Sequence, residues 1–165
     1  MARWRPPKPR SSPYITPEGG KALNAELKAL WLQRRQEVVP ALQAAAAEGD
    51  RSENAEYIYR KRQLAGIDRR IRYLSKRLDE VQVVHSKPPR DDRVFFGACV
   101  RVEDAAGAKK RYRIVGSDET NAAKGWISVD SPVARALLGK GVGDVVAIDL
   151  PDGRMEVEIT AILYG

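Results

Sequence analysis

The 165-residue sequence predicts an α+β fold: a long N-terminal antiparallel α-helical coiled-coil hairpin and a small C-terminal antiparallel β-sheet domain with one short helix. Three observations predict it. Apolar residues recur at three- and four-residue steps through residues 57–81, and short runs with two-residue alternation fill residues 98–163. Pro88 and Pro89 separate the two patterns.

Four segments follow from this division. Residues 1–13 hold four basic residues, four prolines and no acid, which predicts a basic, disordered arm. Residues 14–85 are expected to form the hairpin, residues 86–93 a linker, and residues 94–165 the C-terminal domain.

The first helix of the hairpin is expected to start at Pro17, with Thr16 as its N-cap, and to stop at Gly49. Pro40 should bend it, because proline lacks a backbone donor and its ring clashes with the preceding turn. The apolar stripe of this helix consists of Leu23, Leu27 and Leu30.

The second helix gives the clearest periodic signal. Its apolar residues follow a heptad seam, interrupted only at Arg60: Tyr57, Leu64, Ile67, Ile71, Leu74, Leu78 and Val81. Two helices of roughly 30 residues joined by a short turn can bury their stripes only against each other. The predicted hairpin is about 45 Å long at a rise of 1.5 Å per residue.

The C-terminal domain is expected to contain one short helix, which begins at Pro132 with Ser131 as its N-cap. The domain shows no nucleophile–base pair, phosphate loop or metal-ligand cluster, so we expect it to dock onto another molecule. Its predicted strands span residues 98–103, 110–115, 126–129, 145–150 and 155–163.

The single cysteine, Cys99, excludes an intramolecular disulfide and fits a reducing compartment; its apolar neighbours predict a buried thiol. The single histidine, His85, has no ligand partner at the spacing that zinc needs. The sequence has no signal peptide and no long apolar span, which predicts a cytoplasmic monomer without membrane contact.

The positive charge lies in the first half of the chain. Residues 1–85 hold 17 Lys and Arg against 10 Asp and Glu, whereas residues 86–165 hold 12 of each. A localised positive field is typical of proteins that bind a polyanion, and solubility alone is the simpler alternative.

The turn between the long helices is acidic, with Asp50, Glu53 and Glu56. The spacing of Asp50 and Glu53 fits a helix capping box, which is the structural interpretation. A hairpin tip also leaves carboxylates free to bind Mg²⁺, which prefers oxygen ligands. One or two carboxylates hold Mg²⁺ weakly, so a second macromolecule would have to complete the site.

Behind the tip, the second helix carries a basic stripe with a single acid, Asp68, within it. We expect this stripe to lie on the exposed face and to contact RNA phosphates, although a solvated surface is the alternative. Tyr57, Tyr59 and Tyr73 could stack on bases, with packing favoured for Tyr57. The stripe consists of Arg60, Lys61, Arg62, Arg69, Arg70, Arg72, Lys76 and Arg77.

These segments resemble the Gre transcript-cleavage factors of bacterial RNA polymerase. Residues 49–57 (GDRSENAEY) are similar to the tip signature of that family, and residues 67–74 (IDRRIRYL) are similar to the GreB subtype. The resemblance continues through residues 94–98, 112–116 and 127–138 and covers about residues 14–164.

The resemblance implies that the hairpin enters the secondary channel of a backtracked polymerase. Asp50 and Glu53 would then help hold a second Mg²⁺, shared with the polymerase, beside its own aspartates. The nascent RNA 3′ end would be cut while the basic stripe grips it. The chain itself would be an accessory factor and no enzyme, with an FKBP-like C-terminal docking domain.

The sequence departs from the family pattern in its N-terminal arm, in a proline at Pro40 instead of near Gln36, and in the basic pair Arg34 and Arg35. Two other functions remain open. One is a Gre-like regulator that binds the secondary channel without stimulating cleavage. The other is a coiled-coil RNA-binding arm unrelated to polymerase.

Overall fold

The computed structural model describes residues 6–50, 53–85, 88 and 92–165. The chain forms two compact units: residues 20–81 make the first, and residues 82–165 together with the segment up to Gly19 make the second. Residues 1–5 of the predicted arm, most of the predicted linker, and Arg51 and Ser52 of the acidic turn lie outside the described residues.

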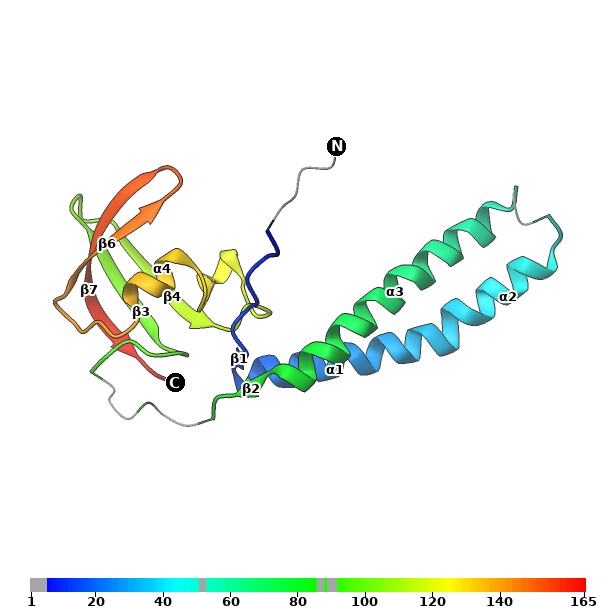
Figure 1. Cartoon of the computed structure of the whole chain (residues 1–165), viewed down its shortest axis with the longest axis horizontal. Helices are drawn as coiled ribbons and strands as arrows, with labels where there is room; N and C mark the ends of the chain where they lie inside the picture. Colours follow the sequence, from blue (N-terminus) through cyan, green and yellow to red (C-terminus); the bar gives the residue numbers. More distant parts are fainter. Residues whose placement is uncertain (1–5, 51–52, 86–87, 89–91) are drawn as a thin grey trace. The chain divides into compact units, whose positions relative to one another are not determined.

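The first unit is a helical hairpin, as the sequence predicts (Figure 1). Helix α1 spans Pro17–Gln33, a π-helical turn spans Arg34–Val38, and helix α2 spans Val39–Ala47. Helix α3 spans Ala55–Glu80 and returns along them. Its 26 residues correspond to about 39 Å of helix.

The predicted seam holds the hairpin together. Ile67, Ile71 and Leu74 of α3 are buried, as is Val38 of the π-helical turn. Val38 packs with Ile67 and Ile71, and Leu27, Leu30 and Leu64 pack around this cluster.

The chain does not simply bend at Pro40. It widens just before Pro40 into the π-helical turn, where Val39 N–H donates to the carbonyl of Arg34, five residues back. Val38 follows Leu30 by eight residues, and Leu42 follows Val38 by four. A heptad pattern would use one residue fewer between Leu30 and Leu42. The wider turn absorbs the extra residue and keeps Val38 fully buried on the seam.

The second unit contains a five-stranded sheet in the order β5-β4-β3-β7-β6. All neighbouring pairs in this sheet are antiparallel except β4 and β5, which run parallel. Residues 116–125 carry the chain back along β4, so that Trp126 at the start of β5 pairs with Arg113. The strands are β3 (Cys99–Asp104), β4 (Lys109–Val115), β5 (Trp126–Ser128), β6 (Val145–Leu150) and β7 (Gly153–Leu163).

Helix α4 (Pro132–Leu137) packs on this sheet through Ala134 and Leu137. Ser131 Oγ accepts a hydrogen bond from Ala134 N–H at 3.2 Å, so the predicted N-cap is confirmed. Cys99, expected to be buried, is only half-buried at the start of β3. The core consists of Val94, Ala98, Val100, Val102, Ile114, Ala134, Leu137, Val146, Ile148, Val157 and Ile159.

A two-stranded parallel sheet that the sequence did not reveal completes this unit. It pairs β1 (Tyr14–Ile15) with β2 (Gln82–Val83). Ser12 and Pro13, which the sequence assigned to the arm, also make hydrogen bonds: Ser12 N–H donates to Asp130, and Pro13 C=O accepts from Gln82.

Glu119 fixes the start of α1 within the same unit. Its carboxylate accepts hydrogen bonds from Gly116 N–H at 2.8 Å, from Thr16 N–H at 3.1 Å, and from the Thr16 hydroxyl. Thr16 Oγ1 in turn accepts from Gly19 N–H at 3.1 Å. The predicted N-cap of α1 is therefore confirmed.

Candidate functional site

Asn54 organises the hairpin tip. Its side-chain oxygen accepts from Tyr57 N–H at 3.0 Å, which makes Asn54 the N-cap of α3. Its side-chain nitrogen donates to the Ala45 carbonyl at 2.7 Å, in the last turn of α2. Gly49 has φ 124°, a value that favours glycine, and ends α2 as predicted. One amide therefore joins the two helix ends.

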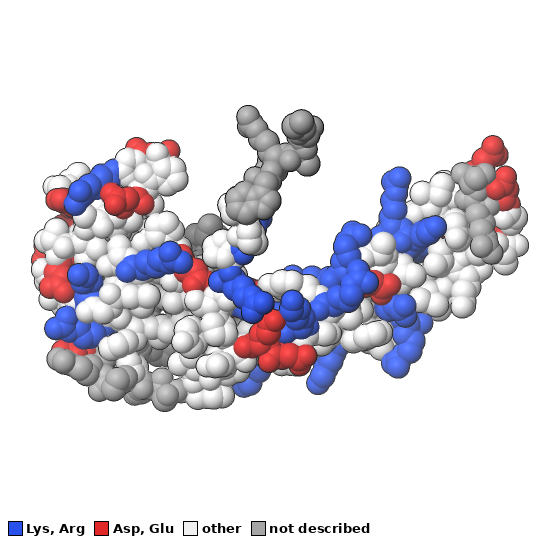
Figure 2. Space-filling model, viewed as in Figure 1, with Lys and Arg blue, Asp and Glu red and all other residues white. Residues whose placement is uncertain are grey.

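The capping-box interpretation of Asp50 and Glu53 is wrong, because Asn54 occupies the cap position instead. Both acids precede α3, and both are exposed. Figure 2 shows acidic side chains gathered at the end of the hairpin. N-capping of α3 was the main structural alternative to metal binding for these carboxylates, and Asn54 performs it instead.

The donor set at the tip suits Mg²⁺, which takes carboxylate oxygens and keeps several waters. In the part of the chain that the structure describes, no group of three or more His, Cys, Asp or Glu residues could hold a metal ion.

Glu56, the third acid of the predicted tip, lies in the first turn of α3 and serves the hairpin. It accepts a hydrogen bond from Arg60 Nε at 2.7 Å, which raises the pKa of Arg60 above its ordinary value. Arg60 Nη1 also lies 3.7 Å from Glu37 on the other arm. Arg60 thus bridges the two arms at the point where the apolar seam is interrupted.

The predicted basic stripe separates into three groups. Arg77 is only 7% exposed, so its prediction as an RNA contact is wrong. Arg60 and Arg70 are held by acids, the latter through two hydrogen bonds to Glu26 at 2.7 and 3.0 Å. Five stripe residues are exposed and, among the described residues, form no ion pair: Lys61, Arg62, Arg69, Arg72 and Lys76.

The three tyrosines differ in exposure. Tyr57 is half-buried, and the Lys61 ammonium lies 6.0 Å from its ring centroid. Tyr59 is 58% exposed and Tyr73 46% exposed. Packing therefore explains Tyr57, and the other two have ring surface to offer a base.

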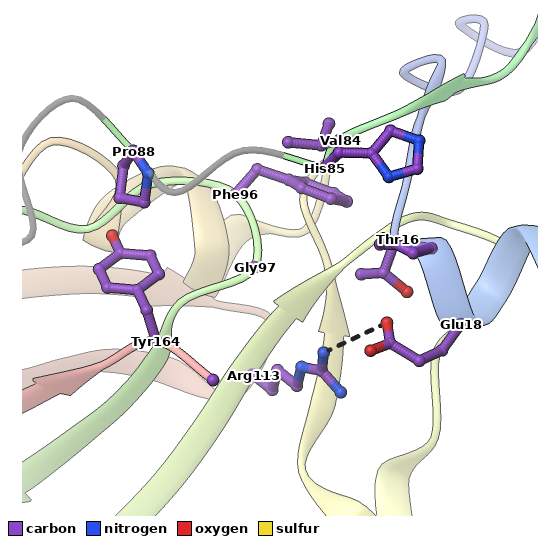
Figure 3. Close-up of a pocket in the computed structure, with 11 residues that line it drawn as sticks. Thr16, Glu18, Val84, His85, Pro88, Phe96, Gly97, Arg113 and Tyr164 are labelled. Carbon is purple, nitrogen blue, oxygen red and sulfur yellow. Dashed lines mark ion pairs between the residues drawn. The ribbon is translucent and has the colours of Figure 1, made fainter.

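The second unit contains a cavity of about 280 Å³ (Figure 3). His85 and Phe96 line it from one side, and Arg113 and Glu18 form an ion pair at 3.9 Å at its edge. Among the described residues that line it, none is a cysteine or serine.

Sequence reasoning missed two structural residues, Asn54 and Glu119. The signal for Asn54 was its position directly before Ala55 and Glu56, since Asn is a preferred N-cap and an acid favours the first turn. Glu119 gave no signal for its contact with the start of α1, because its partner Thr16 lies 103 residues away in the sequence.

The comparisons with known proteins agree with this fold. Residues 13–83 match the family described as "Transcription elongation factor, N-terminal", and residues 88–164 match "Transcription elongation factor, GreA/GreB, C-term". The transcription elongation factor GreB of Xanthomonas axonopodis pv. citri is 59% identical over 166 residues, which cover 100% of this chain and 99% of the relative.

GreB of Pseudomonas aeruginosa is 52% identical over 164 residues, covering 99% of this chain and 98% of the relative. The solved structure of GreA factor homolog 1 of Thermus thermophilus is 27% identical with a TM-score of 0.43, covering 93% of this chain and 99% of that one. Fold and tip define a transcription elongation factor. The chain belongs to the GreA/GreB family, and both relatives described above are of the GreB type.

None of the described helices is both long and apolar enough to cross a membrane.

Proposed function

We propose that this protein binds bacterial RNA polymerase through its secondary channel, in the cytoplasm, and stimulates the polymerase's own endonucleolytic cleavage of backtracked nascent RNA. Asp50 and Glu53 would help hold the second Mg²⁺ of that reaction. The arrangement of side chains at the tip supports this proposal most strongly. Asn54 caps α3, and both carboxylates remain exposed ahead of the helix.

The role of this chain's own residues is positioning. The seam packs the two arms together behind the tip, and Asn54 links the two helix ends that flank Asp50 and Glu53. A pair of carboxylates on such an arm can be delivered to a site that already holds acidic ligands. Mg²⁺ bound there would activate a water for in-line attack on the phosphodiester.

The exposed part of the basic stripe would hold the RNA 3′ segment. Lys61 and Arg62 lie within two turns of the start of α3, and Arg69, Arg72 and Lys76 continue along the helix. Guanidinium groups bind phosphate oxygens through two parallel hydrogen bonds, which suits a strand that must be held in one register.

The proposal is tested with Asp50→Asn and Glu53→Gln on a defined backtracked complex. Each change removes a metal-binding charge and keeps the size of the side chain. Transcript cleavage should fall by about two orders of magnitude, the scale on which one electrostatic stabiliser contributes to catalysis. Affinity for polymerase should stay within about twofold, because binding uses other surfaces.

Glu48→Gln is the matched control, since Glu48 is an exposed acid at the end of α2 outside the pair. Its cleavage rate should equal that of the wild type. Unchanged cleavage in both Asp50→Asn and Glu53→Gln would contradict the proposed mechanism. Tight binding without any shortened transcripts from the wild type would instead support the non-cleaving regulator.

A further inference from the structure

A second apolar surface runs along the first arm of the hairpin. Trp31 is 50% exposed and Leu32 46% exposed, and Val39 is half-buried beside them. These three side chains line a hollow of about 680 Å³ together with Lys28, Arg34 and Arg35.

This surface is distinct from the seam. Lys28, Trp31, Leu32, Arg35 and Val39 follow three- and four-residue steps, which place them on one face of the helical arm. The residues of this arm that pack in the seam cluster lie on the neighbouring face: Leu27, Leu30 and Val38. Trp31 and Leu32 therefore contribute little to the hairpin core.

The indole of Trp31 is held in place by the hairpin. The Arg34 guanidinium carbon lies 5.8 Å from the ring centroid, and Arg34 Nε donates to Asp68 Oδ1 of α3 at 2.8 Å. An ion pair between the two arms thus positions the cation that packs on the ring. A side chain ordered before binding loses less entropy when a partner arrives. Tryptophan and arginine are also the residues most enriched among interface hot spots.

We infer that this surface, defined by Trp31, Leu32 and Val39, is a protein-docking site that takes an apolar side chain flanked by carboxylates. All three charged residues of its lining are cationic, so an acidic partner complements it. Leu32 and Val39 widen the apolar area beside the indole, which favours an aliphatic or aromatic side chain over an RNA base. The inference rests on the proposed function, which makes a wall of the polymerase channel the partner.

The test measures the affinity of the full chain for RNA polymerase core enzyme in the absence of nucleic acid. Trp31→Ala should raise the Kd at least about tenfold, as expected for a central tryptophan of an interface. Trp31→Phe should recover part of the loss. Arg35→Glu should weaken binding and should reduce its salt dependence. Cleavage by Trp31→Ala at saturating concentration should approach the wild-type rate, because the tip is unchanged.

Tyr73→Ala is the matched control. Tyr73 is 46% exposed, and the Arg70 guanidinium carbon lies 5.3 Å from its ring centroid. Like Trp31, it is an exposed aromatic residue beside an arginine, but it lies on α3 and does not line the hollow. Its Kd should stay within about twofold of the wild type, and both variants should have the wild-type melting temperature.

A wild-type Kd in Trp31→Ala would overturn this inference and leave the proposed function unaffected. Loss of affinity only for free single-stranded RNA would overturn it in favour of a nucleic-acid site. A wild-type chain that does not bind polymerase would instead contradict the proposed function.

Discussion

A single amide side chain, that of Asn54, connects the two helix ends at the tip. Asn54 accepts from Tyr57 N–H and donates to the Ala45 carbonyl, so it links the last turn of α2 to the first turn of α3. Asn54→Ala should destabilise the chain by about 1 kcal/mol, the usual contribution of an N-cap. Cleavage on backtracked complexes should fall severalfold, because Asp50 and Glu53 lose their fixed support. Thermal melting and transcript cleavage measure the two effects.

Asn54→Ser separates the two hydrogen bonds. Serine keeps a cap acceptor for the first turn of α3 and loses the reach to Ala45. We expect it to recover most of the stability and only part of the cleavage. Full cleavage by Asn54→Ala would show that the bond to Ala45 has no part in placing the acids.

The sequence predicted the acidic tip and misplaced its cap by four residues. Asp50 and Asn54 are both preferred cap residues, and local spacing favoured Asp50 because Glu53 follows it. The position of the Ala45 carbonyl in the folded hairpin favours Asn54. A contact between two helices leaves no trace in the periodicity of either one.

At the scale of the elements, the π-helical turn maintains the register of the first arm. The buried residues Leu23, Val38 and Ala45 fit a continuous heptad only if one residue between Leu30 and Val38 is left out. Deleting Gln36 together with Pro40→Ala should therefore give an uninterrupted α-helix with the same seam. Its free energy of unfolding, measured with urea by far-UV circular dichroism, should rise by up to about 3 kcal/mol, the cost of proline within a helix.

Pro40→Ala alone is the comparison for that deletion. The extra residue remains in this variant, so the wide turn must persist to keep Val38 buried, and the gain should be smaller. An equal gain from Pro40→Ala alone would show that proline, and not register, causes the turn.

Ion pairs between the arms make the hairpin sensitive to acid. The hydrogen bond from Arg70 lowers the pKa of Glu26 below its ordinary value of 4.5. The ionised carboxylate therefore stabilises the folded hairpin above pH 4.5, and this stabilisation is lost as the pH falls through the lowered pKa. Because both side chains are partly exposed, the contribution should be roughly 0.5 kcal/mol.

Glu26→Gln should lower the melting temperature slightly at neutral pH and should melt like the wild type at a pH below the lowered pKa of Glu26. Glu80→Gln removes an exposed acid at the end of α3 and should show no such convergence. A constant difference between Glu26→Gln and the wild type at all pH values would contradict the role of the charge.

The elements themselves differed in how far the sequence could predict them. Strands β3, β6 and β7 were found from two-residue alternation, since buried and more exposed residues alternate along each. In β4 the buried residues Ile114 and Val115 are adjacent, so its burial does not follow this alternation. The two-residue strands β1 and β2 are too short to show alternation, and they pair across the whole hairpin sequence. The parallel direction of β5 depends on the path of residues 116–125, which no local pattern specifies.

On the scale of the whole molecule, the positive charge is concentrated where the structure leaves it accessible. Residues 86–165 are neutral in formal charge, and the surplus of seven lies in residues 1–85. Along α3, part of that charge is used within the hairpin, at Arg60 and Arg70. The exposed remainder of the basic stripe is what a polyanion would meet. It lies on the same helix as the paired cations Arg60 and Arg70, so the two sets can be separated by mutation.

Replacing Arg62, Arg69 and Arg72 together with Gln should therefore weaken binding to a backtracked complex in a salt-dependent way. Each lost contact to single-stranded RNA should reduce the slope of log K against log salt by about 0.7, so the triple variant should lose about 2 in slope. Its melting temperature should be unchanged, since none of the three residues forms an ion pair among the described residues. The double variant Arg60→Gln with Arg70→Gln should do the opposite, because it breaks links to Glu56 and Glu26 and leaves the exposed cations in place. Equal slopes for the triple variant and the wild type would mean that the stripe is only a solvated surface, and that the grip on RNA comes from the polymerase alone.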